Sequence, residues 1–156
     1  MTAPHQIPKI IHYCWFGQTP LPEKAQCCIA SWKKFCPGYE IMEWNEHQLD
    51  LLSAPSYVQQ AYAAQKWAFV ADYVRLCALI KYGGVYMDTD VELLHPLAPF
   101  MSQEAFAGFE DTSHGVRTGV SSFQGIPVPL QQYAIFETGR HIEHHHECGS
   151  SNRDLS

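Results

Sequence analysis

A glycine pair, a short apolar run and two carboxylates follow one another in the middle of the chain. The pair Gly83 and Gly84 ends a helix-like segment, so residues 85–87 are expected to form a buried strand. Asp88 and Asp90 then lie where that strand emerges at a sheet edge, which is where open α/β sheets bind ligands. Two carboxylates in this place suit Mg²⁺ or Mn²⁺, and an ion held this way clamps a diphosphate. The alternative for an isolated Asp-x-Asp is a pair of solvated side chains.

The size and composition of the chain predict one globular domain. It has 156 residues, of which 46% are hydrophobic and 13% are aromatic, and its formal net charge is −6. This charge argues against a nucleic-acid partner. No apolar run approaches the roughly 20 residues that cross a bilayer, and residues 1–6 lack a signal-peptide pattern. We therefore expect a cytoplasmic protein without a transmembrane segment, either soluble or peripheral at the inner face of the membrane.

The cysteines are expected to be reduced and buried. The chain has six cysteines and no Cys-x-x-Cys pair, so a zinc site is not expected. A disulfide framework would be the alternative in a secreted chain. Four cysteines occur within apolar patterns: Cys14, Cys27, Cys28 and Cys77.

Segments of strand length alternate with segments of helical spacing, which predicts an α/β/α sandwich around a mostly parallel sheet. The expected strands are residues 7–16, 39–44, 85–87 and 105–109, with an extended continuation at 91–94. The expected helices are residues 22–36, short helices within residues 49–64 that Pro55 breaks, residues 65–81 and a short helix at 130–136.

The last part of the chain differs in composition from the rest. We expect residues 1–120 to form the domain and residues 121–156 to be a degenerate or truncated segment that is partly disordered. The histidine-rich residues 141–146 are expected to bind transition metals adventitiously at most.

Three polar or aromatic features have both an ordinary and a functional interpretation. Asp72 and Arg75 are three residues apart on the expected helix, so they form either a simple ion pair or a pair that faces Asp88. Trp15, at the end of the first strand, is either a core residue or a stacking platform for a flat base. Glu92 either faces the same side as Asp90 or is a solvated surface residue. The spacing alone leaves all of these alternatives open.

Three separated blocks carry a family resemblance: residues 7–17 (IPKIIHYCWFG), residues 31–45, and residues 68–92, which contain AFVADYVR and YGGVYMDTDVE. Within the second block the matching pieces are Ser31-Trp32, residues 37–40 and Trp44-Asn45. Together they resemble the glycosyltransferases with an Asp-x-Asp sugar-binding region. That group includes capsular-polysaccharide and mannosyl transferases and, more distantly, the clostridial glucosylating toxins.

The resemblance implies a GT-A fold that binds a nucleotide-diphosphate sugar donor. In this role Trp15 stacks on the donor's base. Asp72 and Arg75 hold the donor sugar, and Tyr86 lines the same pocket.

The resemblance also implies a Mn²⁺ or Mg²⁺ cofactor and transfer with retention of anomeric configuration. Asp90 ligates the metal directly, while Asp88 contacts ribose or sugar hydroxyls and approaches the metal. The implied catalytic residues are Asp88, Asp90 and Arg75, and the acceptor is a saccharide or a glycolipid.

Two alternatives to an active transferase remain. Relatives extend beyond the length of this chain, and residues 116–120 only begin to resemble their continuation, so a truncated domain that binds a nucleotide sugar without transferring it is one alternative. The other is a phosphatase of the haloacid-dehalogenase type, with Asp88 as nucleophile. That class needs a downstream Lys, and no Lys follows Glu92.

Overall fold

The computed structural model describes residues 6–103, 105–107, 110–112, 115–117 and 133–136. In chain order its strands are β1 (Ile10–Cys14), β2 (Glu40–Trp44), β3 (Gly84–Met87), β4 (Ala105–Ala107), β5 (Glu110–Thr112), β6 (Gly115–Arg117) and β7 (Tyr133–Phe136). Its helices are α1 (Glu23–Phe35), α2 (Ser56–Ala63), α3 (Trp67–Tyr82) and the short 3-10 helix η1 (Ala98–Phe100).

Five strands form one sheet in the order β2-β1-β3-β7-β4, and every neighbouring pair is parallel. Strands β5 and β6 form a separate antiparallel pair. The expected mostly parallel sheet is therefore confirmed. Because the sheet is parallel, the carboxyl ends of β1, β2 and β3 lie along one edge.

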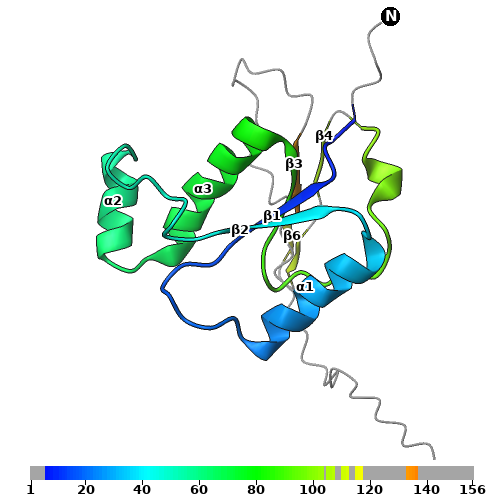
Figure 1. Ribbon diagram of the computed structural model, residues 1–156, viewed down its shortest axis with the longest axis horizontal. Coiled ribbons are helices and arrows are strands. Elements are labelled where there is room, and N and C mark those ends of the chain that lie inside the picture. Colours follow the sequence, from blue (N-terminus) through cyan, green and yellow to red (C-terminus); the bar gives the residue numbers. More distant parts are fainter. Residues whose placement is uncertain (1–5, 104, 108–109, 113–114, 118–132, 137–156) are drawn as a thin grey trace, which may run out of the picture.

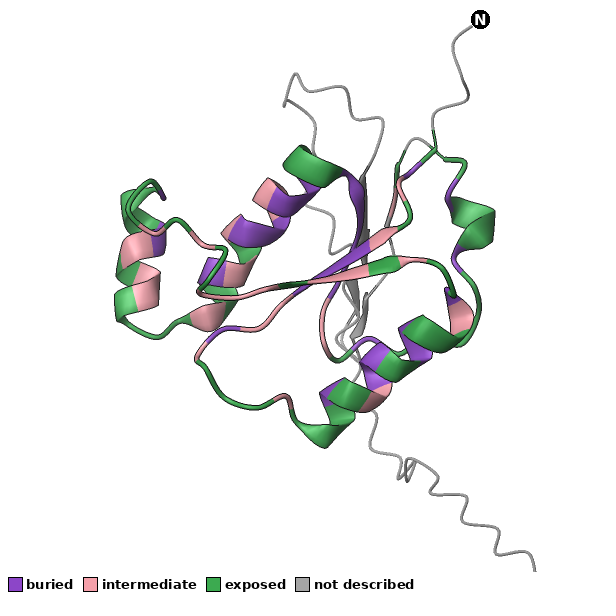
Figure 2. Cartoon of the chain, in the orientation of Figure 1, coloured by how far each residue is buried: buried purple, intermediate pink, exposed green. Residues whose placement is uncertain are grey.

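Helices α1 and α3 cover opposite faces of this sheet. Successive side chains of β1 point to opposite faces, so they pack against different helices. Ile11 and Tyr13 pack with Trp32 of α1 in one core cluster. Cys14 packs instead against a second cluster that contains Val70 of α3. Figure 1 shows the two helices on either side of the strands, and Figure 2 shows buried residues gathered on β1 and β3. The α/β/α layering is thus confirmed.

The local sequence explains where these elements begin and end. Helix α1 starts directly after Pro22, and α2 starts after Pro55; proline suits the start of a helix, where its missing N–H costs no hydrogen bond. Helix α3 ends at Gly83, whose φ of 64° is readily adopted by glycine.

Strand β7 corrects one sequence-based prediction. A short helix was expected over residues 130–136, and this is wrong for Tyr133–Phe136, which pair with both β3 and β4. Such a short apolar run has no periodicity that separates a buried strand from a helical turn. Residues 91–94 form a loop without strand pairing, although an extended segment was expected there.

Several expectations concern residues outside the described part of the chain. These are the domain boundary at residue 120, the partial disorder expected within residues 121–156, of which the structure describes Tyr133–Phe136 alone, and the histidine-rich run at 141–146. Among the described helices, none is both long enough and apolar enough to span a membrane. The cysteines of the described part form no disulfide; Cys28 and Cys36 are buried as expected, whereas Cys14, Cys27 and Cys77 are partly buried.

His12 ties β1 to β2 and to the end of α3. It is 0% exposed. Its Nε2 lies 2.8 Å from the carbonyl oxygen of Gly83, and the indole N–H of Trp44 donates to its Nδ1 at 3.1 Å. Nδ1 must therefore be an acceptor, so the ring is neutral with its hydrogen on Nε2. Burial lowers the pKa of His12, which reinforces this neutral state.

We expect this histidine to make the protein less stable in mild acid. The unfolded chain protonates His12 near its ordinary pKa of 6.5, whereas the folded chain keeps it neutral to a lower pH. The free energy of unfolding should therefore fall as the pH drops below about 6.5, by about 1.4 kcal/mol for each unit by which folding lowers the pKa. Urea unfolding between pH 5 and 8 measures the slope. The matched variant His12→Gln should unfold more easily at pH 8 but show a flatter profile, and parallel profiles would contradict the assignment.

Candidate functional site

The candidate site lies at the sheet edge where β1, β2 and β3 end. From β1 the chain crosses through α1 to β2 on one side, and β3 lies on the other side of β1. The strand order therefore reverses between β1 and β3, which is where α/β sheets bind ligands. Trp15 directly follows β1 and Asp88 directly follows β3, so the topology places both residues at this point.

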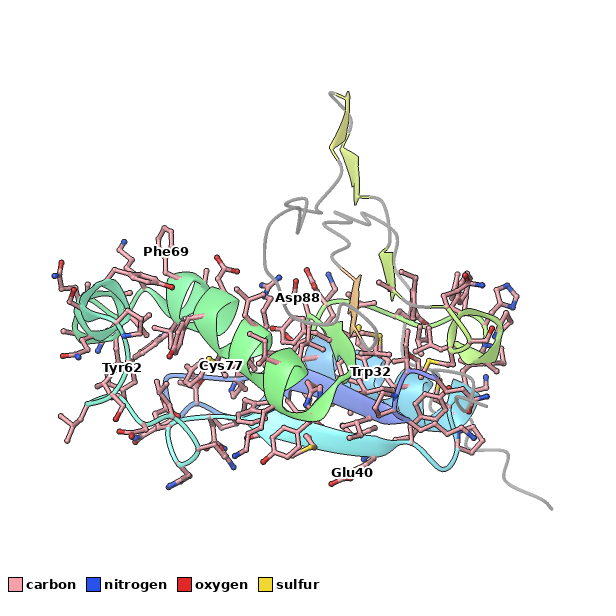
Figure 3. The ribbon with its side chains drawn as sticks, turned by 90° about the horizontal axis from the view of Figure 1, so that it is seen from above. Trp32, Glu40, Tyr62, Phe69, Cys77 and Asp88 are labelled. Carbon is pink, nitrogen blue, oxygen red and sulfur yellow. The ribbon has the colours of Figure 1, made fainter. Side chains whose placement is uncertain are left out.

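Arg75 of α3 joins the two acidic side chains predicted for the site. Its Nη2 lies 2.9 Å from Asp72 Oδ1 and 3.6 Å from Asp88 Oδ1. Arg75 is 9% exposed. Figure 3 shows Asp88 beside α3, where this contact forms. The pair is thus an intrahelical ion pair and also a bridge to the strand end, so the two interpretations of Asp72 and Arg75 are compatible.

Tyr86 contacts both Asp88 and Arg75. It is 1% exposed, its hydroxyl donates to Asp88 Oδ1 at 3.1 Å, and the guanidinium carbon of Arg75 lies 4.6 Å from its ring centroid. Burial raises the pKa of Tyr86 well above its ordinary value, and the nearby charge of Asp88 adds to this shift. Tyr86 therefore stays a neutral hydrogen-bond donor to the carboxylate.

Cys14 is a member of the cluster that the sequence reasoning treated only as a buried thiol. Burial raises its pKa to about 12, although a hydrogen bond with Tyr86 and the positive charge of Arg75 oppose the shift. The thiol is therefore neutral and a poor nucleophile. Its role at the end of β1 is to pack beside the Tyr86 hydroxyl.

A cleft of about 290 Å³ opens next to this cluster. Trp15 forms part of its wall, is partly buried, and packs against the core cluster on the α1 side of the sheet. Its indole N–H donates to the carbonyl of Thr19 at 2.7 Å. The ring therefore combines a packing contact with a surface that a flat ligand could reach. The lining residues are Cys14, Trp15, Phe16, Gly17, Thr19, Trp67, Ala68, Ala71 and Thr89.

The loop after β1 is held by two residues that the sequence reasoning missed. The backbone N–H of Gly17 donates to the Glu46 carboxylate at 2.6 Å. Gly17 has a φ of 96°, and a Cβ added there would lie 2.9 Å from the indole nitrogen of Trp67. Only a glycine lets Trp67 approach this closely, so the cleft wall depends on residues from three separate segments.

Ala68 and Ala71 also line the cleft without having been identified from the sequence. A signal for them was present, because Ala68, Asp72 and Arg75 follow one another at helical spacing. The small side chains of Ala68 and Ala71, on the same stripe as Asp72 and Arg75, leave open space beside that pair.

Asp90 and Glu92 are exposed at the loop after β3. Burial raises the pKa of Cys28 on α1, and the nearby negative charges of Glu92 and Asp90 raise it further. In the described part of the chain, no three His, Cys, Asp or Glu side chains cluster as a metal site. Two carboxylates, Asp88 and Asp90, nevertheless follow the end of β3, and Mg²⁺ is commonly held by one or two carboxylates together with substrate phosphates. The residues present fit such an ion.

The chain is similar to known glycosyltransferases over most of its described part. Residues 22–107 match the family model described as the glycosyltransferase sugar-binding region containing a DXD motif. Inositol phosphoceramide mannosyltransferase 3 of Schizosaccharomyces pombe is 32% identical over 129 residues, covering 80% of this chain and 36% of that protein. Inositol phosphoceramide mannosyltransferase 1 of the same organism is 27% identical over 111 residues, covering 65% and 33%.

The chain therefore spans about a third of the length of these curated relatives. Among solved structures it is similar to PaToxG glycosyltransferase, with a TM-score of 0.48 and 23% identity over 60% of this chain and 46% of that chain. The Asp88-Thr89-Asp90 sequence lies inside the range that the family model matches. The chain belongs to the family defined by the glycosyltransferase sugar-binding region with a DXD motif.

Proposed function

We propose that this chain is the donor-binding part of a metal-dependent glycosyltransferase of the GT-A type. It moves a sugar from a nucleoside diphosphate to an acceptor, with retention of anomeric configuration. The observation that supports this most is the contact between Arg75 of α3 and Asp88 at the end of β3, at 3.6 Å. It brings a cation from α3 and a carboxylate from the end of β3 together at the sheet edge beside the cleft. This arrangement suits a ligand that carries both hydroxyls and phosphates.

Each residue of the cluster has a defined task in this proposal. Arg75 donates charge-assisted hydrogen bonds to the donor, and Asp72 accepts from a sugar hydroxyl. Tyr86 holds the Asp88 carboxylate in place, and Trp15 stacks on the base. Because these groups are fixed before the donor arrives, they stabilise developing charge without rearranging.

Asp88 and Asp90 would hold a Mn²⁺ or Mg²⁺ ion, with Asp90 as the direct ligand. When bound, the ion supplies positive charge that stabilises the departing diphosphate. Asp90 is exposed and, among the described residues, forms no ion pair. Its carboxylate therefore loses no protein partner when it binds the ion, whereas Asp88 is already held by Tyr86 and Arg75.

The acceptor is proposed from the names of the relatives. Both curated relatives are named inositol phosphoceramide mannosyltransferases. A mannose donor and a glycolipid acceptor are therefore the first pair to test, followed by saccharide acceptors. Binding of a nucleotide sugar without transfer is the alternative, because the chain spans about a third of these relatives. Donor binding together with absent transfer would favour that alternative.

Calorimetric titration of Mn²⁺ in the presence of GDP or UDP tests the proposed site. Asp90→Ala should weaken Mn²⁺ binding at least about tenfold, or about 1.4 kcal/mol, and more than Asp88→Ala does, because Asp90 is the direct ligand. Glu40→Ala is the matched control, since Glu40 is an exposed carboxylate on β2 far from Asp88 (Figure 3). Equal Mn²⁺ affinity in the wild type and Asp90→Ala would refute the site.

Trp15→Ala should weaken binding of the nucleoside diphosphate by about 1–3 kcal/mol, as expected for loss of base stacking. The free energy of unfolding should fall by less than the roughly 3–5 kcal/mol of a core tryptophan truncation, because Trp15 is only partly buried. Trp15→Phe keeps an aromatic face and should retain more of the affinity. A large loss of stability with unchanged nucleotide affinity would identify Trp15 as a core residue instead.

A further inference from the structure

The loop that carries Asp90 is tied to α1 by two neighbouring residues of that helix. The indole N–H of Trp32 donates to the carbonyl oxygen of Val91 at 2.8 Å. The backbone N–H of Leu93 donates to the hydroxyl oxygen of Ser31 at 2.9 Å. Both bonds join segments about sixty residues apart in the sequence, so local chain geometry does not produce them.

Both anchors are rigid. Trp32 is 0% exposed and Ser31 is 9% exposed. The Ser31 hydroxyl donates to the carbonyl of Cys28 at 2.5 Å, so its oxygen is oriented to accept from Leu93. Tyr13 packs edge-on against the Trp32 ring with centroids 5.8 Å apart, which fixes the direction of the indole N–H. The two hydrogen bonds therefore come from side chains that are already held in place.

A third hydrogen bond closes the loop itself. The backbone N–H of Val91 donates to the carbonyl oxygen of Asp88 at 3.0 Å. The backbone N–H of Val91 is thus bonded within the loop, and the carbonyl oxygen of Val91 is bonded to Trp32. Asp90 lies in this turn, directly before Val91, whose N–H and carbonyl oxygen are both hydrogen-bonded. Its backbone is fixed although its side chain is exposed.

We propose that Ser31 and Trp32 are positioning residues that hold the backbone of Asp90 so that its carboxylate is placed for a divalent ion before the ion binds. This proposal rests on the proposed function. The Asp90 side chain forms no ion pair within the described part of the chain, so its placement depends on the backbone. Groups that orient a metal ligand commonly change metal affinity by 10–100-fold when they are removed.

The test measures Mn²⁺ binding by water-proton relaxation on the full chain with GDP present, because substrate phosphates complete the coordination of an ion held by two carboxylates. Ser31→Ala removes the acceptor of the Leu93 amide and should weaken Mn²⁺ binding about tenfold. Ser31→Thr keeps the hydroxyl and should restore most of the affinity. Trp32→Phe keeps an aromatic ring but loses the N–H that donates to Val91, so it should also weaken Mn²⁺ binding. Amide hydrogen exchange without metal should become faster at Leu93 in Ser31→Ala.

Tyr13→Phe is the matched control. Tyr13 belongs to the same core cluster as Trp32. The substitution removes the 2.6 Å hydrogen bond from the Tyr13 hydroxyl to Glu43 but leaves Ser31 and Trp32 intact. Its Mn²⁺ affinity should equal that of the wild type. Folded Ser31→Ala and Trp32→Phe with wild-type Mn²⁺ affinity would overturn the positioning role, as would an equal loss in Tyr13→Phe. Absence of Mn²⁺ binding in the wild type would instead overturn the proposed function, and the positioning role with it.

Discussion

Gly84→Ala should lower the free energy of unfolding by about 2–6 kcal/mol. Gly84 opens β3 with a φ of 95°, and a Cβ there would lie 2.6 Å from the carbonyl oxygen of Ile10 in β1. A non-glycine residue in a sparsely populated backbone region costs about 1–3 kcal/mol, and forcing extra volume into a packed core costs a similar amount. The contact is with backbone, so no side chain can turn aside to relieve it. Urea unfolding monitored by tryptophan fluorescence measures the loss.

Gly38→Ala separates the two contributions. Gly38 has a similar φ of 83°, but nothing lies within 4 Å of a Cβ added there. It should therefore show only the cost of the backbone conformation, and the difference between the two variants reports the contact with Ile10. Similar losses in both variants would show that β1 and β3 separate easily at this point.

Arg75→Lys should reduce donor-analogue binding, and transfer where it is measurable, at least about tenfold, or about 1.4 kcal/mol. The substitution keeps the charge but loses the planar fork. Its Nη2 lies 2.9 Å from Asp72 and 3.6 Å from Asp88, while the guanidinium carbon lies 4.6 Å from the Tyr86 ring centroid. An ammonium group has no planar face to lie on the Tyr86 ring and no fork for a bidentate contact with a phosphate. Calorimetry with a nucleoside diphosphate and Mn²⁺ measures the effect.

Lys81→Ala is the control for the charge of α3, because Lys81 is exposed and lies 5.1 Å from the ring centroid of Tyr82 at the far end of the helix. Its removal should leave donor binding unchanged. If Arg75→Lys leaves both affinity and turnover unchanged, the pair of Asp72 and Arg75 is structural only.

The sequence was most informative where local chemistry determines the structure. Pro22 marked the start of α1, and Gly83 marked the end of α3. The apolar run before Asp88 became the fully buried β3. These features depend on residues next to one another in the chain, so the helices, the first three strands and the parallel sheet could be predicted.

The details of the candidate site depend on contacts between distant segments, which the sequence pattern does not contain. Spacing predicted that Asp72 and Arg75 are neighbours but left open whether the pair faces Asp88, which Arg75 does at 3.6 Å. Nothing in the pattern showed that Glu46 holds Gly17 or that Ser31 accepts from Leu93. Each contact follows from the packing of whole elements across the sheet, and only the structure reveals it.

The position of β7 has a consequence for how the sheet is completed during synthesis. β7 pairs with β3 on one side and β4 on the other, although both precede it in the chain. Among the described strands, β4 has no other partner. Until residues 133–136 emerge, β3 exposes an unpaired edge, and such edges template association with other chains. The order of translation therefore leaves β3, which Asp88 directly follows, with an unpaired edge in the nascent protein until β7 has been made.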